Sequence, residues 1–132
     1  MHITLESDYA LRIVACLARH KKRLDAKTIA EHTGVTLRFA LKILRKLVAS
    51  GIVKSFKGTQ GGYEVQRPPE EISLADVIET VEGPYYFCRC LNDTYTCSHE
   101  PDAACCSFQG AFNDITAVVR EKMRFYTFDK LL

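Results

Sequence analysis

Five of the six cysteines of this 132-residue chain fall within residues 88–106, called here the cysteine segment. They are Cys88, Cys90, Cys97, Cys105 and Cys106. Thiolates are the soft ligands that suit zinc and iron–sulfur clusters, and neighbouring thiols can also form reversible disulfides. In a reducing compartment, clustered cysteines indicate a metal or redox site and not a structural disulfide framework. The cysteine segment therefore predicts a metal site or a thiol switch.

The cysteine segment shows neither a helical nor a strand period. Unstructured loops longer than about 15 residues are uncommon in compact domains unless they are functional or tied down. Several thiols bound to one metal centre would fix the path of such a loop. Two further residues could in principle bind a metal, and we expect neither to do so: Cys16 should be an inert core residue and His99 should face solvent.

The charges divide between the two halves of the chain. Residues 1–67 hold 13 Lys and Arg against 5 Asp and Glu, whereas residues 68–132 hold 5 against 11, so the net charge of +2 combines a basic and an acidic half. A basic half indicates a polyanionic partner. No apolar run reaches the ~18 residues that a membrane helix needs, and the start lacks a secretory leader pattern, so a cytoplasmic protein with no membrane partner is expected.

Capping residues and glycines divide the basic half into three expected helices. These begin after Ser7, Asp25 and Thr36, whose side chains can accept backbone hydrogen bonds at a helix start. Gly34 can end the second helix in the left-handed conformation, and Gly51 ends the third. Two helices joined by a short turn that contains glycine match the helix-turn-helix arrangement.

The third helix combines an apolar stripe with a basic face. The stripe consists of Phe39, Ile43, Leu44, Leu47 and Val48. Packing this stripe on the core leaves four basic side chains outward: Arg38, Lys42, Arg45 and Lys46. A helix charged in this way can lie between the phosphate walls of a major groove while its first residues reach base edges. We therefore expect double-stranded DNA as a partner.

A glycine-rich hairpin follows the third helix. Residues 52–56 alternate like a half-buried strand, residues 63–65 form a second strand, and three glycines lie in between. A helix-turn-helix followed by such a hairpin is a winged helix, and Lys57 at the base of the wing can reach a minor groove or a phosphate. The other wing residues predicted to contact DNA are Thr59, Gln60 and Gly61.

The acidic half predicts two further helices. Ser73 and Asp76 form an acidic capping box before a helix over residues 74–82, and Gly83 with the following proline ends it. A helix of about fifteen residues then carries the apolar stripe Phe112, Ile115, Val119, Met123 and Tyr126. Taken alone, this stripe predicts packing against its own domain.

Motifs along nearly the whole chain resemble the IscR/NsrR group of the Rrf2 family of transcription regulators. They are S-D-Y-A-L-R at residues 7–12, the stretch 29–47, K-G-T-Q-G-G-Y at residues 57–63, I-S-L-A-D-V-I at residues 72–78 and E-G at residues 82–83. The resemblance implies a dimeric winged-helix regulator, of the repressor type, that reads a palindromic operator and has no small-molecule substrate. It also implies that the C-terminal helix forms the dimer and holds two recognition helices one DNA turn apart.

The resemblance assigns DNA-facing positions on the third helix. The positions that face base edges in the family correspond here to Thr36, Arg38, Phe39, Leu41 and Lys42. Lys46 extends the same basic face, and Lys57 takes the place of the basic wing residue. Family members often carry Glu or Gln where this chain has Leu41 and Lys42, so the operator sequence does not carry over.

The resemblance also implies a cluster held by three cysteines. Cys90 and Cys97 match the first two cysteines of the family motif. Cys106 matches the third, because Phe112 then falls where the family has Trp, and Cys105 is its close competitor. The gaps between these cysteines are longer than in the family motif, which leaves the ligand choice and the cluster type, 4Fe-4S or 2Fe-2S, open.

A fourth ligand is suggested by the same comparison. The IscR branch has a histidine three residues after the third cysteine, where this chain has Gln109. The NsrR branch takes an Asp from the other subunit, and Asp8 stands at that position. An acid in the first turn of a helix also has a purely structural use, because it favours the helix dipole.

These observations predict a mainly α fold with a small β wing, in three regions. Residues 1–67 form the winged helix-turn-helix, residues 68–110 the connecting helix and cysteine-rich sensor loop, and residues 111–132 the C-terminal dimerisation helix. The expected function is operator binding controlled by an iron–sulfur cluster that senses redox state, nitric oxide or iron–sulfur status. The alternatives are a metal-free thiol switch and a zinc-stapled regulator or interaction module. An enzyme is not expected, because no P-loop, nucleotide fingerprint or catalytic-triad spacing occurs.

Overall fold

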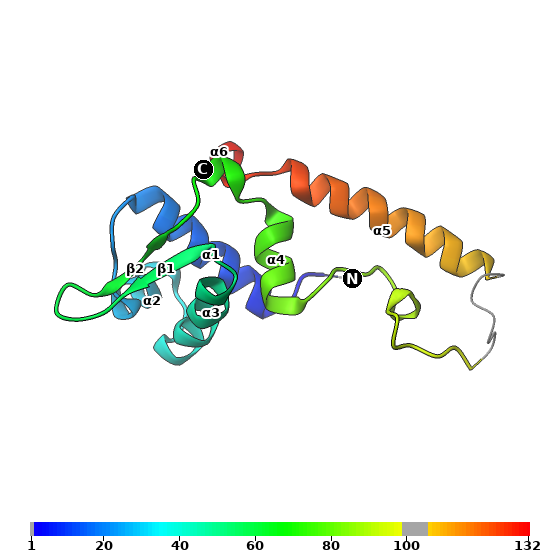
Figure 1. Cartoon of the computed structure of the whole chain (residues 1–132), viewed down its shortest axis with the longest axis horizontal. Coiled ribbons are helices and arrows are strands. Elements are labelled where there is room, and N and C mark those ends of the chain that lie inside the picture. Colours follow the sequence, from blue (N-terminus) through cyan, green and yellow to red (C-terminus); the bar gives the residue numbers. More distant parts are fainter. Residues whose placement is uncertain (1, 99–105) are drawn as a thin grey trace.

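The structure, a computed structural model, describes residues 2–98 and 106–132. Figure 1 shows a helical body that carries a two-stranded wing at one end and a long helix that extends from the other. The body begins with three helices, α1 (Leu5–His20), α2 (Ala26–Thr33) and α3 (Leu37–Ala49). The wing consists of β1 (Val53–Phe56) and β2 (Gly62–Val65), which pair antiparallel with Val53 opposite Val65. The expected mainly α fold with a β wing is confirmed.

The turn between α2 and α3 forms as the capping residues predict. Asp25 accepts a hydrogen bond from the backbone N–H of Thr28 at 2.7 Å, and Thr36 accepts one from the N–H of Phe39 at 3.3 Å. Gly34 ends α2 with φ +70°, a left-handed conformation that glycine adopts without strain. These local interactions fix the point at which α3 begins and therefore which of its side chains face outward.

The start of α1 differs from the sequence prediction. Thr4, and not Ser7, caps this helix, and its hydroxyl accepts a hydrogen bond from the Ser7 N–H at 3.2 Å. Ser7 is fully buried, and its hydroxyl donates to the carboxylate of Glu82 in the fourth helix. The prediction of a Ser7 cap was wrong because the long-range bond to Glu82 cannot be read from local sequence.

The core lies where α1 and α3 meet. Ile13, Leu17, Ile43, Leu44 and Leu47 are fully buried, so the predicted apolar stripe of α3 does face inward. Close packing of such side chains holds α3 in one orientation, because removing even a few methyl groups leaves a costly cavity. Cys16 is also buried, as expected, and burial raises the pKa of its thiol.

The wing is attached to the linker between α1 and α2. The backbone of Leu24 exchanges two hydrogen bonds with that of Tyr63, at 2.9 and 2.7 Å. The Arg23 guanidinium stacks on the ring of Phe56, 3.3 Å from its centroid, and donates to the carbonyl of Gln60 at 2.9 Å. These contacts fix the wing relative to the body.

The acidic half adds a connecting helix and an extended one. Helix α4 (Leu74–Glu82) begins with the predicted capping box of Ser73 and Asp76 and is followed by Gly83. Helix α5 (Ser107–Phe125) is longer than predicted; it begins far from the body and runs back to it, where α6 (Phe128–Leu131) lies (Figure 1). Short 3-10 turns occur at Pro69–Glu71 and Arg89–Leu91. In the described part of the chain, no helix is long and apolar enough to cross a membrane.

Candidate nucleic-acid interface and cysteine segment

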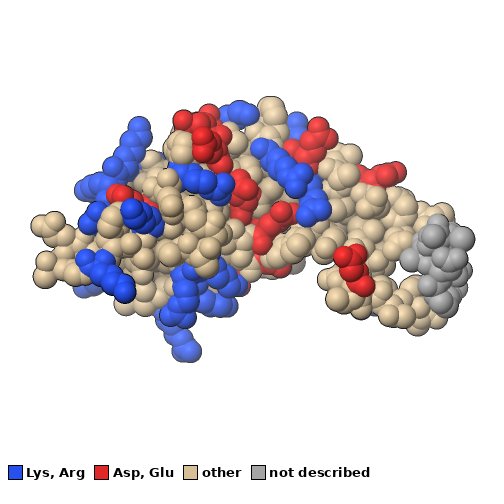
Figure 2. Space-filling view, in the orientation of Figure 1, with Lys and Arg blue, Asp and Glu red and all other residues tan. Residues whose placement is uncertain are grey.

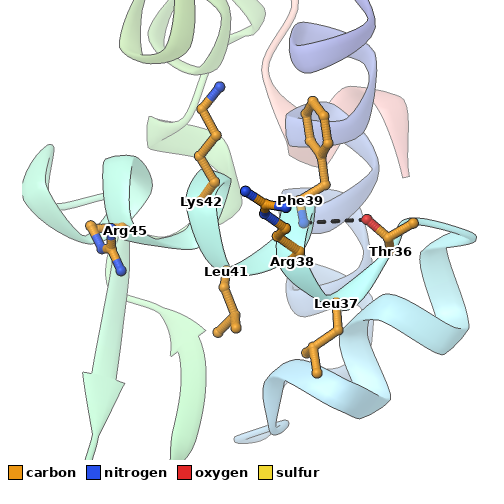
Figure 3. Close-up of a pocket in the computed structure, with 7 residues that line it drawn as sticks. All are labelled: Thr36, Leu37, Arg38, Phe39, Leu41, Lys42 and Arg45. Carbon is orange, nitrogen blue, oxygen red and sulfur yellow. Dashed lines mark hydrogen bonds between the residues drawn. The ribbon is translucent and has the colours of Figure 1, made fainter.

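One face of α3 is exposed along its whole length and is bordered by basic side chains. A shallow hollow of about 930 Å³ lies along it and is lined by its exposed residues and by Phe39, whose ring points toward α1 (Figure 3). On the face drawn in Figure 2, Lys and Arg gather over the winged-helix half of the molecule. We call this face the α3 surface; it comprises Thr36, Leu37, Arg38, Leu41, Lys42 and Arg45.

Two of the predicted DNA contacts are also engaged within the protein. Phe39 is half-buried, with its ring edge-to-face against Tyr9 at 5.5 Å between centroids. The Lys42 ammonium lies 3.6 Å from a carboxylate oxygen of Glu6 and 5.5 Å from the Phe39 ring. The Lys42 side chain remains 56% exposed, so the contact with Glu6 is a solvated ion pair of little energetic weight. Lys42 is therefore free to exchange Glu6 for a phosphate.

Lys46 turns away from the α3 surface. Its ammonium donates to Oε1 of Glu6 at 2.7 Å and to the backbone carbonyl of Val81 at 3.0 Å. Val81 lies at the end of α4, where carbonyl groups lack partners within the helix and the dipole favours a cation. Lys46, predicted from sequence as a DNA contact, thus joins the third helix to the connecting helix.

The wing presents the residues that sequence analysis assigned to it. Lys57, Thr59 and Gln60 are exposed around the tip, and Gly61 is partly covered. A Cβ atom at Gly61 would lie 2.7 Å from the carbonyl oxygen of Phe56, which shows how tightly the tip folds back on its own backbone. A basic residue at a narrow tip suits a phosphate or a minor groove.

The Cys90 thiol interacts with two other thiols of the cysteine segment, those of Cys88 and Cys106. The pKa of Cys88 lies below its ordinary value because the backbone N–H of Cys90, and then its thiol, donate hydrogen bonds to the Cys88 sulfur. Partial burial, and next the hydrogen bond and charge of Cys88, raise the pKa of Cys90; the charge of Cys106 adds to this. All three are half-buried. Cys88, which the sequence left unassigned, is therefore the immediate neighbour of Cys90.

Cys97 and Cys105 are the other cysteines predicted as ligands. Cys97 is half-buried and follows the 3-10 turn along the chain, and Cys105 lies outside the described residues, as does His99. Gln109 donates through its amide to the Cys90 carbonyl at 3.0 Å, so it fixes the loop. Among the described residues, no three His, Cys, Asp or Glu side chains lie close enough together to hold one metal ion. The donor set is thiol-rich and suits iron or zinc, and the interactions within it are pairwise, between Cys88 and Cys90 and between Cys90 and Cys106.

Asp8 lies on the first turns of α1, in the winged-helix body. Its carboxylate pairs with the guanidinium of Arg12, one turn later, at 2.6 Å. The Asp8 side chain is 38% exposed, so it can be reached by a second molecule. Both roles considered for Asp8, helix support and ligation of a partner's cluster, are compatible with this position.

The residues just before the cysteine segment are bonded to α4 and to α5. A carboxylate oxygen of Glu79 accepts from the backbone N–H of Tyr85 at 3.2 Å and from Nε of Arg120 at 2.9 Å. The N–H of Phe87 donates to the Thr116 hydroxyl at 3.0 Å. Glu79 thus ties the connecting helix both to the chain that leads into the cysteines and to the long helix.

Helix α5 exposes most of its apolar side chains. Of its described residues, Thr116 is the one that is buried. Phe108, Val118 and Phe125 are 73%, 66% and 55% exposed, and Ile115 is 40% exposed. A contiguous apolar face of this kind usually marks an interaction site.

Similarity to known proteins agrees with this geometry. Residues 3–132 match the Rrf2 family, described as iron-dependent transcriptional regulators. The chain belongs to the Rrf2 family of transcriptional regulators. It is 30% identical to protein aau3 of Rhizobium meliloti, over all of this chain and 85% of that protein. It is 27% identical to the HTH-type transcriptional regulator NsrR of Shouchella clausii, over all of this chain and 89% of that protein.

A solved Rrf2-type structure supports the same fold. CymR, the global cysteine regulator of B. subtilis, superposes with a TM-score of 0.78 at 26% identity, over 99% of this chain and 95% of that chain. The family and the NsrR relative are transcriptional regulators and not enzymes, as the sequence predicts. In the Rrf2 context, α2 and α3 form the helix-turn-helix and α3 is its recognition helix.

Sequence reasoning missed two features of this Rrf2 site. The first is Leu37, which lies on the α3 surface and is 47% exposed. It is four residues from Leu41, so both leucines lie on one helical face. The link from Lys46 to Val81 joins residues 35 positions apart and has no local signal. The first could have been read from helical periodicity, whereas the second required the fold.

Proposed function

We propose that this Rrf2 regulator is a homodimer that binds a palindromic DNA operator and whose affinity is controlled by an iron–sulfur cluster at the cysteine segment. The observation that carries the regulatory part is a pair of hydrogen bonds at α4: Glu79 accepts from Tyr85, three residues before Cys88, and Val81 accepts from Lys46 of α3. The DNA-binding part follows from the exposed basic α3 surface and from the family.

The proposed DNA interface consists of the α3 surface and the wing. Arg38, Lys42 and Arg45 border the surface that would enter a major groove, and Thr36 lies at the helix start, where base edges are reached. Lys57 on the wing would contact a phosphate or the adjacent minor groove. Phe39 and Leu41 supply apolar contacts, and Thr59, Gln60 and Gly61 follow the backbone of the duplex.

The proposed dimer uses the exposed face of α5. A helix with a single buried residue gains little from packing within its own chain, and a second copy would cover the apolar face symmetrically. Two copies joined in this way present two recognition helices, which matches an operator with two half-sites. Asp8 of one subunit would then be available to the cysteine segment of the other.

The proposed cluster ligands are Cys90, Cys97 and Cys106, with Cys105 as competitor for Cys106. The thiol-rich donor set fits an iron–sulfur cluster, and Asp8 would be the fourth ligand from the partner subunit. When bound, a cluster supplies a centre whose gain, loss or oxidation changes how many thiolates are held together. The close contact of Cys88 with Cys90 makes Cys88 an additional candidate.

The protein's own residues would carry that change to the DNA. A displacement of Cys88 and Cys90 would shift Tyr85, which lies three residues before Cys88 in the chain. The N–H of Tyr85 is bonded to Glu79. Glu79 lies just before Val81 in α4, and the carbonyl of Val81 holds Lys46 of α3. A displacement of α4 would therefore alter the position of the recognition helix. Such a coupling between two sites is reciprocal, so DNA binding would in turn affect cluster stability.

A metal-free thiol switch is the second candidate, and the contact between Cys88 and Cys90 favours it. Oxidation by a peroxide would join the two sulfurs in a disulfide, releasing two protons and two electrons to the peroxide, which becomes water. The same path through Tyr85 and Glu79 would transmit this change. The zinc-stapled module is the third possibility and shares the same thiols.

Purification without oxygen separates these candidates. The cluster predicts brown protein with iron and acid-labile sulfide in stoichiometric amounts. Colourless protein with stoichiometric zinc would favour the zinc module, and colourless, metal-free protein whose operator affinity changes on peroxide treatment would favour the thiol switch. The Cys16→Ser variant is the control, because this buried cysteine lies outside the cysteine segment and its replacement should leave the metal content unchanged.

A further inference from the structure

Two leucines of the recognition helix are left exposed by the fold. Leu37 and Leu41 are 47% and 39% exposed, whereas Leu44 and Leu47 on the same helix are fully buried. Figure 3 shows the two exposed side chains pointing the same way from successive turns of α3. Together they form an apolar strip on the surface proposed to enter the major groove.

Charge determines which partner this strip fits. Arg38, Lys42 and Arg45 lie along one side of it, so a partner must offer negative charge beside an apolar contact. A DNA major groove offers phosphates along both walls and, on its floor, the C5-methyl group of thymine. An apolar strip with a row of basic side chains along one side is complementary to a groove floor beside one phosphate wall.

The spacing of the leucines agrees with the spacing of bases. Residues four apart are separated by about 6 Å along a helix axis. Two base-pair steps of about 3.4 Å cover nearly the same length. One turn of α3 can therefore place Leu37 and Leu41 against methyl groups in base pairs two steps apart in one half-site.

We infer that Leu37 and Leu41 determine sequence specificity by contacting thymine methyl groups, so that each operator half-site contains A·T pairs at the positions they face. The inference rests on the proposed DNA binding and names the bases that this surface reads. Leucine has no donor or acceptor, so a cytosine at the same position would leave its amino group facing an apolar side chain. Thymine is the base whose major-groove edge offers an apolar group.

Replacement of thymine by uracil tests this with the unaltered protein. A duplex is first recovered by selection from a randomised library, and each thymine of its half-sites is then replaced by deoxyuridine, which removes only the methyl group. Burial of one methyl-sized group corresponds to about a fourfold change in affinity, so symmetric replacement in both half-sites should weaken binding about fifteenfold. If every uracil duplex binds as tightly as the parent, the inference is overturned while DNA binding stands.

Variants assign the effect to the two side chains. Leu37→Ala and Leu41→Ala should each lose the sensitivity to uracil at one position, and the exposed Leu132→Ala control should retain it. Both leucines are exposed, so the variants should keep the melting temperature of the parent protein. Uracil sensitivity that persists in both variants would overturn the assignment. If no duplex is recovered at all, the proposed function itself fails, together with the inference.

Discussion

The ammonium of Lys46 donates a hydrogen bond to the carbonyl of Val81 at 3.0 Å and so joins the recognition helix to the end of the connecting helix. The same ammonium is bonded to Glu6 of α1. A cation at this point satisfies a carbonyl that has no partner within α4 and interacts favourably with the helix dipole. Lys46 therefore lies between α4, which is proposed to respond to the cysteine segment, and α3, which is proposed to read DNA.

Replacement of Lys46 by methionine should uncouple these two parts. The variant keeps the aliphatic stem and loses both hydrogen bonds, so the free energy of unfolding should fall by about 1–2 kcal/mol. The ratio of operator affinities measured with and without the cluster should approach one. Lys27→Met, at an exposed position of α2, is the control for both measurements. A Lys46→Met protein that responds as strongly as the parent would show that coupling follows another route.

Replacement of Arg38 and Lys42 by alanine should weaken DNA binding and its dependence on salt. The slope of log affinity against log salt should become shallower by about 0.9 for every phosphate that is no longer neutralised, and a dimer carries each replacement twice. The affinity is measured at several salt concentrations with one duplex. Arg124→Ala combined with Lys130→Ala makes the same change of net charge on exposed residues outside the winged helix. Equal slopes for the two double variants would remove the α3 surface from the interface.

The wing should depend on Gly62. This residue has φ +144°, and a Cβ there would lie 2.6 Å from the carbonyl oxygen of Leu24, so alanine must displace the wing from the linker. Gly62→Ala should destabilise the protein by about 1–3 kcal/mol and weaken operator binding. Gly110→Ala is the matched change, because no atom lies within 4 Å of its Cβ position inside α5. The free energy of unfolding of Gly110→Ala should rise by about 0.5–1 kcal/mol. Thermal unfolding measures the stability of both variants.

Two single substitutions distinguish a ligand role of the Asp8 carboxylate from its role in the ion pair with Arg12. If the carboxylate is a ligand in the partner subunit, Asp8→Asn should accelerate the loss of cluster absorbance in air. Arg12→Gln breaks the same ion pair but keeps the carboxylate, and should leave the decay rate unchanged. Both variants should alter the free energy of unfolding by no more than about 0.5 kcal/mol, since the pair is exposed and one helical turn apart. Identical decay of all three proteins would return Asp8 to a structural role.

The exposed face of α5 should determine the oligomeric state. Val118 is 66% exposed, and Val118→Glu would place a charge in the proposed dimer interface. Sedimentation should then show a monomer, and affinity for a two-site operator should fall by about 100-fold or more because the linked second site no longer contributes. Leu132→Glu, at another exposed apolar position, should remain dimeric. A Val118→Glu protein with the parent sedimentation coefficient would place the dimer interface elsewhere.

The parts of the fold with local causes could be read from the sequence. Thr36, Gly34 and the capping box at Ser73 act on residues three or four positions away, and each takes its predicted place. The face of α3 that would meet DNA followed from the spacing of its apolar stripe. Leu37 was overlooked because exposed leucines carry no charge that marks a binding face.

The parts with long-range causes could not be read in this way. Ser7 bonds to Glu82 and Lys46 to Val81, and neither partner is marked in the local sequence of the other. In the cysteine segment, the fold brings Cys88, to which the family motif gives no role, beside Cys90. Loop conformation depends on tertiary interactions such as the bond from Gln109 to the Cys90 carbonyl, which no periodic pattern encodes.

The most direct test of the central proposal is the operator affinity of one anaerobic preparation before and after removal of its iron. Coupling between a sensor and a DNA-binding site typically changes affinity about 5- to 150-fold. We predict a change within this range, together with stoichiometric iron and acid-labile sulfide in the untreated sample. Equal affinities before and after treatment of protein that held the cluster would contradict control of DNA binding by the cysteine segment.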